Sequence, residues 1–160
     1  MAKIPRMYPL TDKLTNIRIG SAFDAKQLSL ADDRDEWLVL NVSDPADNTD
    51  ADVCIPLVYP IYTGYSLENC GIYTIEIPTV RLTVVATAIL ELSSKPNKKL
   101  MVHCAAGLER SPLAVAWYLH FYHMRSLAEA YKAVRTIRPQ LWDRTAWIKY
   151  DSYYKWLRAR

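Results

Sequence analysis

The chain has 160 residues, of which 51% are hydrophobic and only four are glycine, a composition that excludes an intrinsically disordered protein. No run of 18 apolar residues occurs, so we expect no transmembrane helix, and the first residues, interrupted by Pro5 and Pro9, do not resemble a signal peptide. We therefore expect one globular domain over residues 1–160. The three cysteines, an odd number without framework spacing, favour the reducing cytoplasm.

Charge is distributed unevenly along the sequence, although the net charge is only +3. Residues 1–80 contain twelve Asp and Glu against six Lys and Arg, whereas residues 81–160 contain five against fourteen. The second half is therefore strongly basic, and its field is expected to attract anionic substrates such as phosphate esters.

The first part of the chain predicts strands separated by a short helix. Its Ile, Val and Leu content indicates strands over 14–23 and 37–42, with a short helix over 24–28 between them. The acidic stretch 43–52 is predicted as a solvated loop. A proline restricts the apolar run 53–57 to a sheet edge or an irregular segment.

A tyrosine-rich loop and a further strand, helix and strand are predicted next. We expect the tyrosine-rich stretch 59–65 to lie beside a cleft, and the alternating pattern of 72–77 predicts a strand. Thr79 suits the N-cap of a helix whose apolar residues continue at helical spacing as far as Leu92. The apolar run 99–102 predicts a buried strand.

The most informative stretch follows that strand and precedes a helix with proline in its first turn; it reads His103-Cys104-Ala105-Ala106-Gly107-Leu108-Glu109-Arg110-Ser111. A loop that enters a helix N-terminus directs several backbone N–H groups at one spot and binds anions. Cys104 begins the loop, where those donors and the helix dipole favour a thiolate, and Arg110 ends it with a planar fork suited to two phosphate oxygens. Ser111 can hydrogen-bond the sulfur. A thiolate inside a phosphate-binding loop predicts covalent phosphoryl transfer.

Two more helices are predicted after the one that follows this loop. Ser126 and Glu129 form a capping box that opens the first of them, and Pro139 stops it. The second is predicted over 145–157, where Trp147, Tyr150, Tyr154 and Leu157 recur at helical spacing and are expected to pack in the core.

The pattern His-Cys-x-x-Gly-x-x-Arg-Ser resembles the signature of the cysteine-based protein tyrosine phosphatases, most closely their small dual-specificity branch. The likeness covers most of the chain: 16–22 and 37–42 resemble the first two strands of that branch, and 126–139 resembles the helix after the signature. The resemblance implies an α/β fold with a central, mostly parallel sheet flanked by helices. The signature loop would connect a strand to a helix, with Cys104 at the base of a surface cleft.

The resemblance also implies roles for the signature residues. Cys104 would attack phosphorus and carry a phosphocysteine intermediate, and Ser111 would help the sulfur to leave later. His103 would orient the loop without transferring protons, and a glycine at 107 would allow close backbone approach. The phosphate would be bound by the six residues that follow the nucleophile, namely Ala105, Ala106, Gly107, Leu108, Glu109 and Arg110.

The general acid is where this sequence departs from the family. Relatives place an Asp before the helix that starts near Thr79, to protonate the leaving oxygen, but residues 75–81 contain none. Depending on the direction of counting, that position falls on Glu76 or on Thr79, which is no acid. Glu109, inside the loop, is a second candidate. Farther on, Asp143 or Arg144 stands where relatives place an Asn beside the cleft.

We therefore predict a cytoplasmic, monomeric phosphatase that hydrolyses phosphotyrosine, and phosphoserine or phosphothreonine, on proteins or peptides, with no membrane partner. No metal-ligand spacing is found, so neither a metal nor another cofactor is expected. Two alternatives remain: an RNA 5′-triphosphatase of the same superfamily, with nucleic acid as its partner, and a non-catalytic phosphate-binding module. Cys54 and Cys70 could form a regulatory disulfide with Cys104, although we expect both to be buried, inert thiols.

Overall fold

The computed structural model describes residues 14–58 and 75–159, and within them four strands form one parallel sheet in the order β1-β5-β2-β3. The strands are β1 (Ile17–Gly20), β2 (Trp37–Asn41), β3 (Val53–Cys54) and β5 (Lys99–His103). β5 lies between β1 and β2; Leu100, Val102 and His103 are buried, and Met101 is half-buried. β3 occupies an edge of the sheet, as the proline after it predicted.

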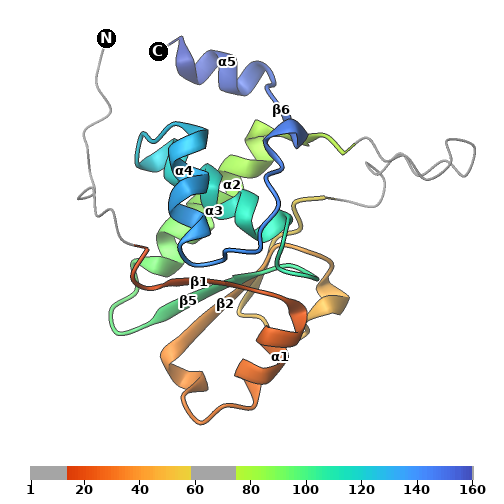
Figure 1. Ribbon diagram of the computed structural model, residues 1–160, viewed down its shortest axis with the longest axis vertical. Coiled ribbons are helices and arrows are strands. Elements are labelled where there is room, and N and C mark those ends of the chain that lie inside the picture. The colour runs from red at the N-terminus through yellow and green to blue at the C-terminus, as the bar shows by residue number, and fades with distance from the viewer. Residues whose placement is uncertain (1–13, 59–74, 160) are drawn as a thin grey trace, which may run out of the picture.

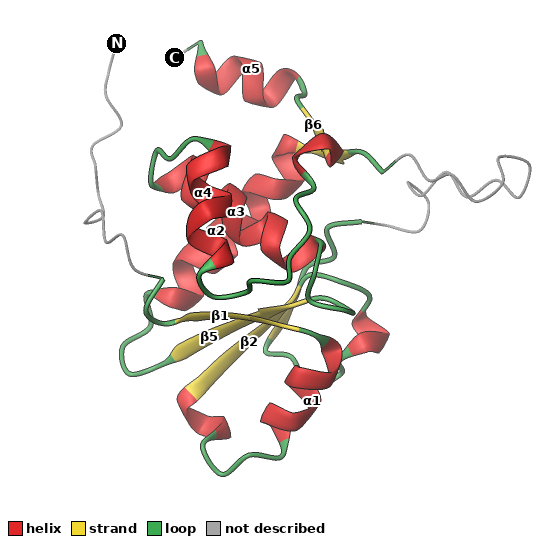
Figure 2. Cartoon of the chain, viewed as in Figure 1, coloured by secondary structure: helices red, strands yellow, loops and turns green. Residues whose placement is uncertain are grey.

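Helices cover both faces of this sheet, which confirms the predicted fold class. Helices α2 (Thr79–Ser93), α3 (Arg110–Tyr122) and α4 (Leu127–Arg135) lie on one face, and α1 (Ala22–Ser29) lies on the other (Figures 1 and 2). A capping box opens α1 at Ser21, and the predicted capping box of Ser126 and Glu129 opens α4. No helix in the described ranges has the length and apolar character needed to cross a membrane.

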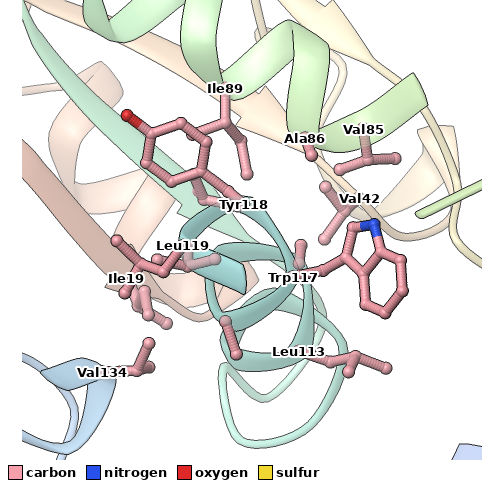
Figure 3. Close-up of a cluster of buried hydrophobic side chains, with 14 of the residues drawn as sticks. Ile19, Val42, Val85, Ala86, Ile89, Leu113, Trp117, Tyr118, Leu119 and Val134 are labelled. Carbon is pink, nitrogen blue, oxygen red and sulfur yellow. The ribbon is translucent and has the colours of Figure 1, made fainter. Parts of the chain in front are cut away.

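The core lies between the sheet and α3, whose residues from Ser111 to Leu119 are all buried. Figure 3 shows Trp117 of α3 beside Val85 and Ala86 of α2, and Leu119 beside Ile19 of β1. The indole N–H of Trp117 donates to Thr83 Oγ1 at 3.2 Å, so the largest buried side chain has no unpaired polar atom. This packing fixes the direction of α3 and therefore the position of its N-terminal end.

The C-terminal region contains a strand of a separate two-stranded sheet, where the sequence predicted only a helix. β4 (Ile77–Pro78) pairs in parallel with β6 (Ile148–Lys149), which follows a 3₁₀ turn over Thr145–Trp147. Helix α5 spans only Ser152–Arg158. The predicted single helix over 145–157 is therefore wrong, because pairing with a strand about 70 residues away overrides the local helical spacing.

The expected packing of that region is also only partly correct. Of its four apolar residues, Tyr150 is exposed, whereas Trp147, Tyr154 and Leu157 are half-buried. Half-burial is what a short helix at the periphery allows.

The N-cap predicted at Thr79 and the strand predicted over 14–23 differ from what is observed. Thr79 is the first residue of α2 and not its N-cap, which is Pro78; the Thr79 hydroxyl instead donates to Asp151 Oδ1. The strand predicted over 14–23 is limited to β1, because α1 begins at residue 22. The 59–65 loop, Cys70 and residues 72–74 of the strand predicted over 72–77 lie outside the described residues. Of the rest of that prediction, only Ile77 is in a strand, β4.

Candidate active site

The signature loop connects the end of β5 to the start of α3, at the carboxyl edge of the parallel sheet. Cys104 directly follows β5 and is 2% exposed. Its Sγ accepts the N–H of Gly107 at 3.2 Å and lies 3.3 Å from Ser111 Oγ, in the first turn of α3. Both groups can donate to the sulfur, so negative charge on it would be solvated by the protein.

The backbone carbonyls of the loop are all held from outside. Each oxygen accepts a hydrogen bond from a neighbouring element or residue: His103 Nδ1 to Cys104 O (3.1 Å), Ala22 N to Ala105 O (2.9 Å), Arg138 Nη2 to Ala106 O (3.4 Å), Arg138 Nε to Gly107 O (3.1 Å), Trp142 N to Leu108 O (2.8 Å) and Leu113 N to Glu109 O (3.1 Å). Since peptide N–H and C=O point in opposite directions, carbonyls fixed outward leave the N–H groups directed inward.

Those N–H groups are available to an anion, which is the role that the sequence predicts for them. Within the described part of the chain, the N–H groups of Ala105, Ala106, Leu108 and Glu109 donate to no protein acceptor. The Arg110 side chain likewise has no hydrogen bond or ion pair with another described residue. Donors of this number around one sulfur suit the oxygens of a phosphoryl group.

Gly107 gives the loop its tight curvature. Its φ is +71°, in the left-handed region that favours glycine. A Cβ at this position would lie 2.7 Å from the backbone of Gly20 and 2.9 Å from Ser21 N, so any side chain would push the loop away from the β1–α1 connection. The close backbone approach predicted for this glycine is therefore observed, and its positive φ is a second reason for glycine here.

Arg138 supports the loop from behind. Besides its two bonds to the carbonyls of Ala106 and Gly107, its Nη1 lies 3.6 Å from Asp24 Oδ2. That carboxylate in turn accepts Ser21 N and Ser21 Oγ at the start of α1. One guanidinium thus joins the loop, α1 and the segment after α4.

His103 holds one tautomer. Asp50 N donates to Asn48 Oδ1, so the Asn48 amide presents its Nδ2 to His103 Nε2, at 3.0 Å. Nε2 therefore accepts, and Nδ1–H donates to Cys104 O. Burial lowers the pKa of His103, outweighing that carbonyl bond and the charges of Asp47 and Asp24. A neutral imidazole bonded on both sides orients the loop, as predicted for this residue.

Glu109 and Glu76, the two candidates for the general acid, form ion pairs in different parts of the structure. Glu109 forms a 3.0 Å ion pair with Arg144 Nε, and both side chains are about one-third exposed (31% and 33%). Glu76 precedes β4, its side chain is 58% exposed, and its carboxylate lies 3.4 Å from Lys149 Nζ of β6. Among the described contacts, none connects Glu76 to the signature loop, and its role as acid stays a prediction.

Of the two residues proposed to replace the family's Asn, Arg144 is the one that contacts the loop. Asp143 Oδ1 accepts from the N–H and hydroxyl of Thr145 within its own turn.

Cys54, expected to be a buried thiol, is exposed at the sheet edge, where partial burial and the charges of Asp44 and Asp47 raise its pKa.

Sequence reasoning missed Arg138 as a site residue and did not define the role of Arg144. Both lie about 30 residues after the signature, in a segment without a short motif. The Arg138-Pro139 pair marked a helix end, but nothing local indicated that the arginine turns back to the loop.

Comparison with known proteins agrees with this geometry. A family model described as "Dual specificity phosphatase, catalytic domain" matches residues 76–150. The chain is 35% identical over 81 residues to "Dual specificity protein phosphatase 26" of Rattus norvegicus, which is 48% of this chain and 38% of that relative. The chain thus spans less than half the length of this curated relative.

Solved structures support the fold. The crystal structure of human DUSP28 covers 84% of this chain with a TM-score of 0.55 at 21% identity, and 85% of that chain is matched. The crystal structure of PTPMT1 covers 93% with a TM-score of 0.59 at 19% identity, and 95% of that chain is matched. Residues 76–150 of this chain are thus similar to the catalytic domain of dual specificity phosphatases, and the chain shares the fold of these solved structures.

Proposed function

We propose that this protein is a cysteine-dependent phosphatase that hydrolyses phosphomonoesters on proteins or peptides, including phosphotyrosine. The observation that carries this proposal is the loop in which every carbonyl from Cys104 to Glu109 is bonded outward around one buried sulfur. The similarity of residues 76–150 to dual specificity phosphatases supports the same activity. A reducing cytoplasm, where a thiolate is preserved, suits such an enzyme, and we propose that it acts there as a monomer.

The reaction proceeds in two displacements. The Cys104 thiolate attacks phosphorus while the bond from phosphorus to the ester oxygen breaks, and that oxygen takes a proton, for which Glu76 is our candidate donor. The loop N–H groups and Arg110 stabilise the charge on the equatorial oxygens. Water then attacks the phosphocysteine; the sulfur leaves as a thiolate, accepting a hydrogen bond from Ser111, and inorganic phosphate departs.

Substitution of the nucleophile tests the covalent mechanism. We expect Cys104→Ser to abolish turnover of a phosphotyrosine peptide while vanadate or phosphate still binds, because the cradle and Arg110 remain. Arg110→Ala should lower both turnover and oxyanion binding. Cys54→Ser is the matched control, since that thiol is exposed at the sheet edge and makes no contact with the signature loop among the described hydrogen bonds, and it should retain activity. Undiminished turnover in Cys104→Ser would contradict the covalent mechanism.

The non-catalytic alternative predicts a different result in the same experiment. A phosphate-binding module would bind the phosphopeptide in both the wild-type protein and Cys104→Ser, and neither would release phosphate.

A further inference from the structure

The signature loop contains a negative charge at a place where it opposes binding of a phosphate. Glu109 is the last loop residue before Arg110, and its N–H is one of the donors that line the cradle. A carboxylate on that residue repels a phosphate dianion, and the repulsion is strong where solvent is partly excluded. The side chain is 31% exposed, so water screens it incompletely.

Arg144 provides the opposite charge at hydrogen-bond distance. Its Nε donates to Glu109 Oε2 at 3.0 Å. The guanidinium carbon also lies 5.3 Å from the ring centre of Trp142 and 5.0 Å from that of Trp147. Contacts with two indole faces restrict the guanidinium far more than an ordinary surface ion pair does.

The backbone around Arg144 is fixed to the same loop and to α4. Trp142 N donates to Leu108 O at 2.8 Å, one residue before Glu109. Arg144 N donates to Tyr131 Oη at 3.2 Å, and burial raises the pKa of Tyr131 to about 12, so this acceptor is a neutral phenol. The cation is therefore placed by backbone bonds to the loop and to α4 that do not involve the carboxylate it meets.

We propose that Arg144 is a positioning residue that neutralises Glu109 and thereby sets the affinity of the signature loop for phosphate dianions. This inference rests on the proposed function. In the alternative, the pair acts only as a mechanical latch between the loop and the 138–147 segment. The two roles predict different changes in phosphate affinity when Arg144 and Glu109 are substituted one at a time.

A double-substitution cycle separates them. The 160-residue protein and its Arg144→Gln, Glu109→Gln and doubly substituted forms are compared by the concentration of inorganic phosphate that protects Cys104 from alkylation by iodoacetamide. Arg158→Gln is the matched control, because Arg158 also lies over an aromatic ring, Tyr154, and donates to it, but on α5. Each measurement is repeated at low and high salt.

Charge neutralisation predicts opposite effects of the two single changes. Arg144→Gln should weaken phosphate binding about tenfold, because it leaves the negative charge of Glu109 uncompensated. Glu109→Gln should leave phosphate binding equal or tighter, because it removes that charge. The double form should return to within about twofold of the wild-type protein, and salt should reduce the effect of Arg144→Gln. Arg158→Gln should bind as the wild-type protein does.

Other outcomes overturn the inference in distinguishable ways. If both single changes weaken binding and the double form is as weak as either, the pair is a latch and the charge role is wrong. If phosphate does not protect Cys104 even in the wild-type protein, the cradle does not bind phosphate and the proposed function itself fails.

Discussion

Two kinds of residue make up the site, those that face the sulfur and those that hold the loop from behind. Cys104, Gly107 and Ser111 lie within one loop and one helical turn, so a contiguous motif identified them. Arg138 and Arg144 reach the loop from a segment that no short pattern marks. Sequence reasoning therefore brought together the groups around the sulfur but not their supports, since the supports depend on tertiary packing.

The general acid has two candidates, Glu76 before β4 and Glu109 inside the loop. An acid matters in proportion to how poor the leaving group is, and its loss costs about 10²–10⁴-fold on a poor one. We expect Glu76→Gln to lower turnover of a phosphotyrosine peptide strongly and to spare an activated aryl phosphate. Steady-state rates on both substrates provide the measurement.

Glu109→Gln serves as the comparison for that prediction. Its carboxylate is paired with Arg144, so its loss should show no dependence on the leaving group. The opposite pattern would place the acid in the loop, and an absence of leaving-group dependence in both variants would mean that neither carboxylate donates the proton.

At the scale of elements, one carboxylate connects two helices. Asp151 is the N-cap of α5, accepting Tyr154 N at 3.1 Å, and it also accepts the Thr79 hydroxyl and Val80 N at the start of α2. Burial alone would raise the pKa of Asp151, but these bonds, first that from Thr79, outweigh it and lower the pKa. The segment that contains Glu76 leads directly into α2, so this cap also fixes the place where that segment ends.

Removal of the cap should destabilise the fold in a pH-dependent way. Loss of an N-cap costs about 0.5–2 kcal/mol, and we expect Asp151→Ala to lower the free energy of unfolding by about that amount at pH 7 in urea titrations. Because the folded-state pKa is lowered, the stabilisation is present above the unfolded value near 3.8 and is lost as pH falls through the folded one. The difference between variant and wild type should therefore shrink in acid.

Asp32→Ala is the control for that measurement, since Asp32 is exposed and has no hydrogen bond with another described residue. It should leave the unfolding free energy unchanged within about 0.5 kcal/mol. An equal loss in both variants, or a difference that persists below the pKa, would show that the Asp151 contacts do not stabilise the fold.

The same contacts explain which elements could be predicted. β2, β5 and α2 follow local apolar periodicity, and α4 has its own capping box, so the sequence alone indicated them. β4 and β6 are two-residue strands that exist because they pair with each other. Such a long-range pairing leaves no local pattern, and this is why 145–157 resembled a continuous helix.

Across the whole molecule, charge is separated in space as well as in sequence. Residues 14–58 hold nine acidic against three basic residues, and 75–159 hold six against thirteen. Figure 1 shows the first group, from red to yellow, below and within the sheet, and the second, from green to blue, mainly in the helical layer above it. The signature loop belongs to the basic layer, so phosphate esters of many kinds are attracted toward it.

This separation leaves two substrate classes to be distinguished, phosphopeptides and triphosphate-ended RNA. A basic layer binds RNA through its backbone charge, and that binding falls steeply between about 50 and 200 mM salt. A single phosphate held by a cradle of directed N–H groups and Arg110 depends less on the distant field. We expect phosphotyrosine peptides to be hydrolysed faster than triphosphate-ended RNA at equal concentration, with the advantage increasing as salt is raised.

Phosphate release from the two substrates at both salt concentrations measures this preference, and Cys104→Ser supplies the background for each. A diphosphate leaving group needs little protonation, so an enzyme selected for RNA ends could work without Glu76. If RNA is the faster substrate at the higher salt, and Glu76→Gln leaves that rate unchanged, the 5′-triphosphatase assignment replaces ours. A faster RNA reaction only at low salt would reflect attraction to the basic layer, because attraction without recognition in the cradle disappears as ions screen it.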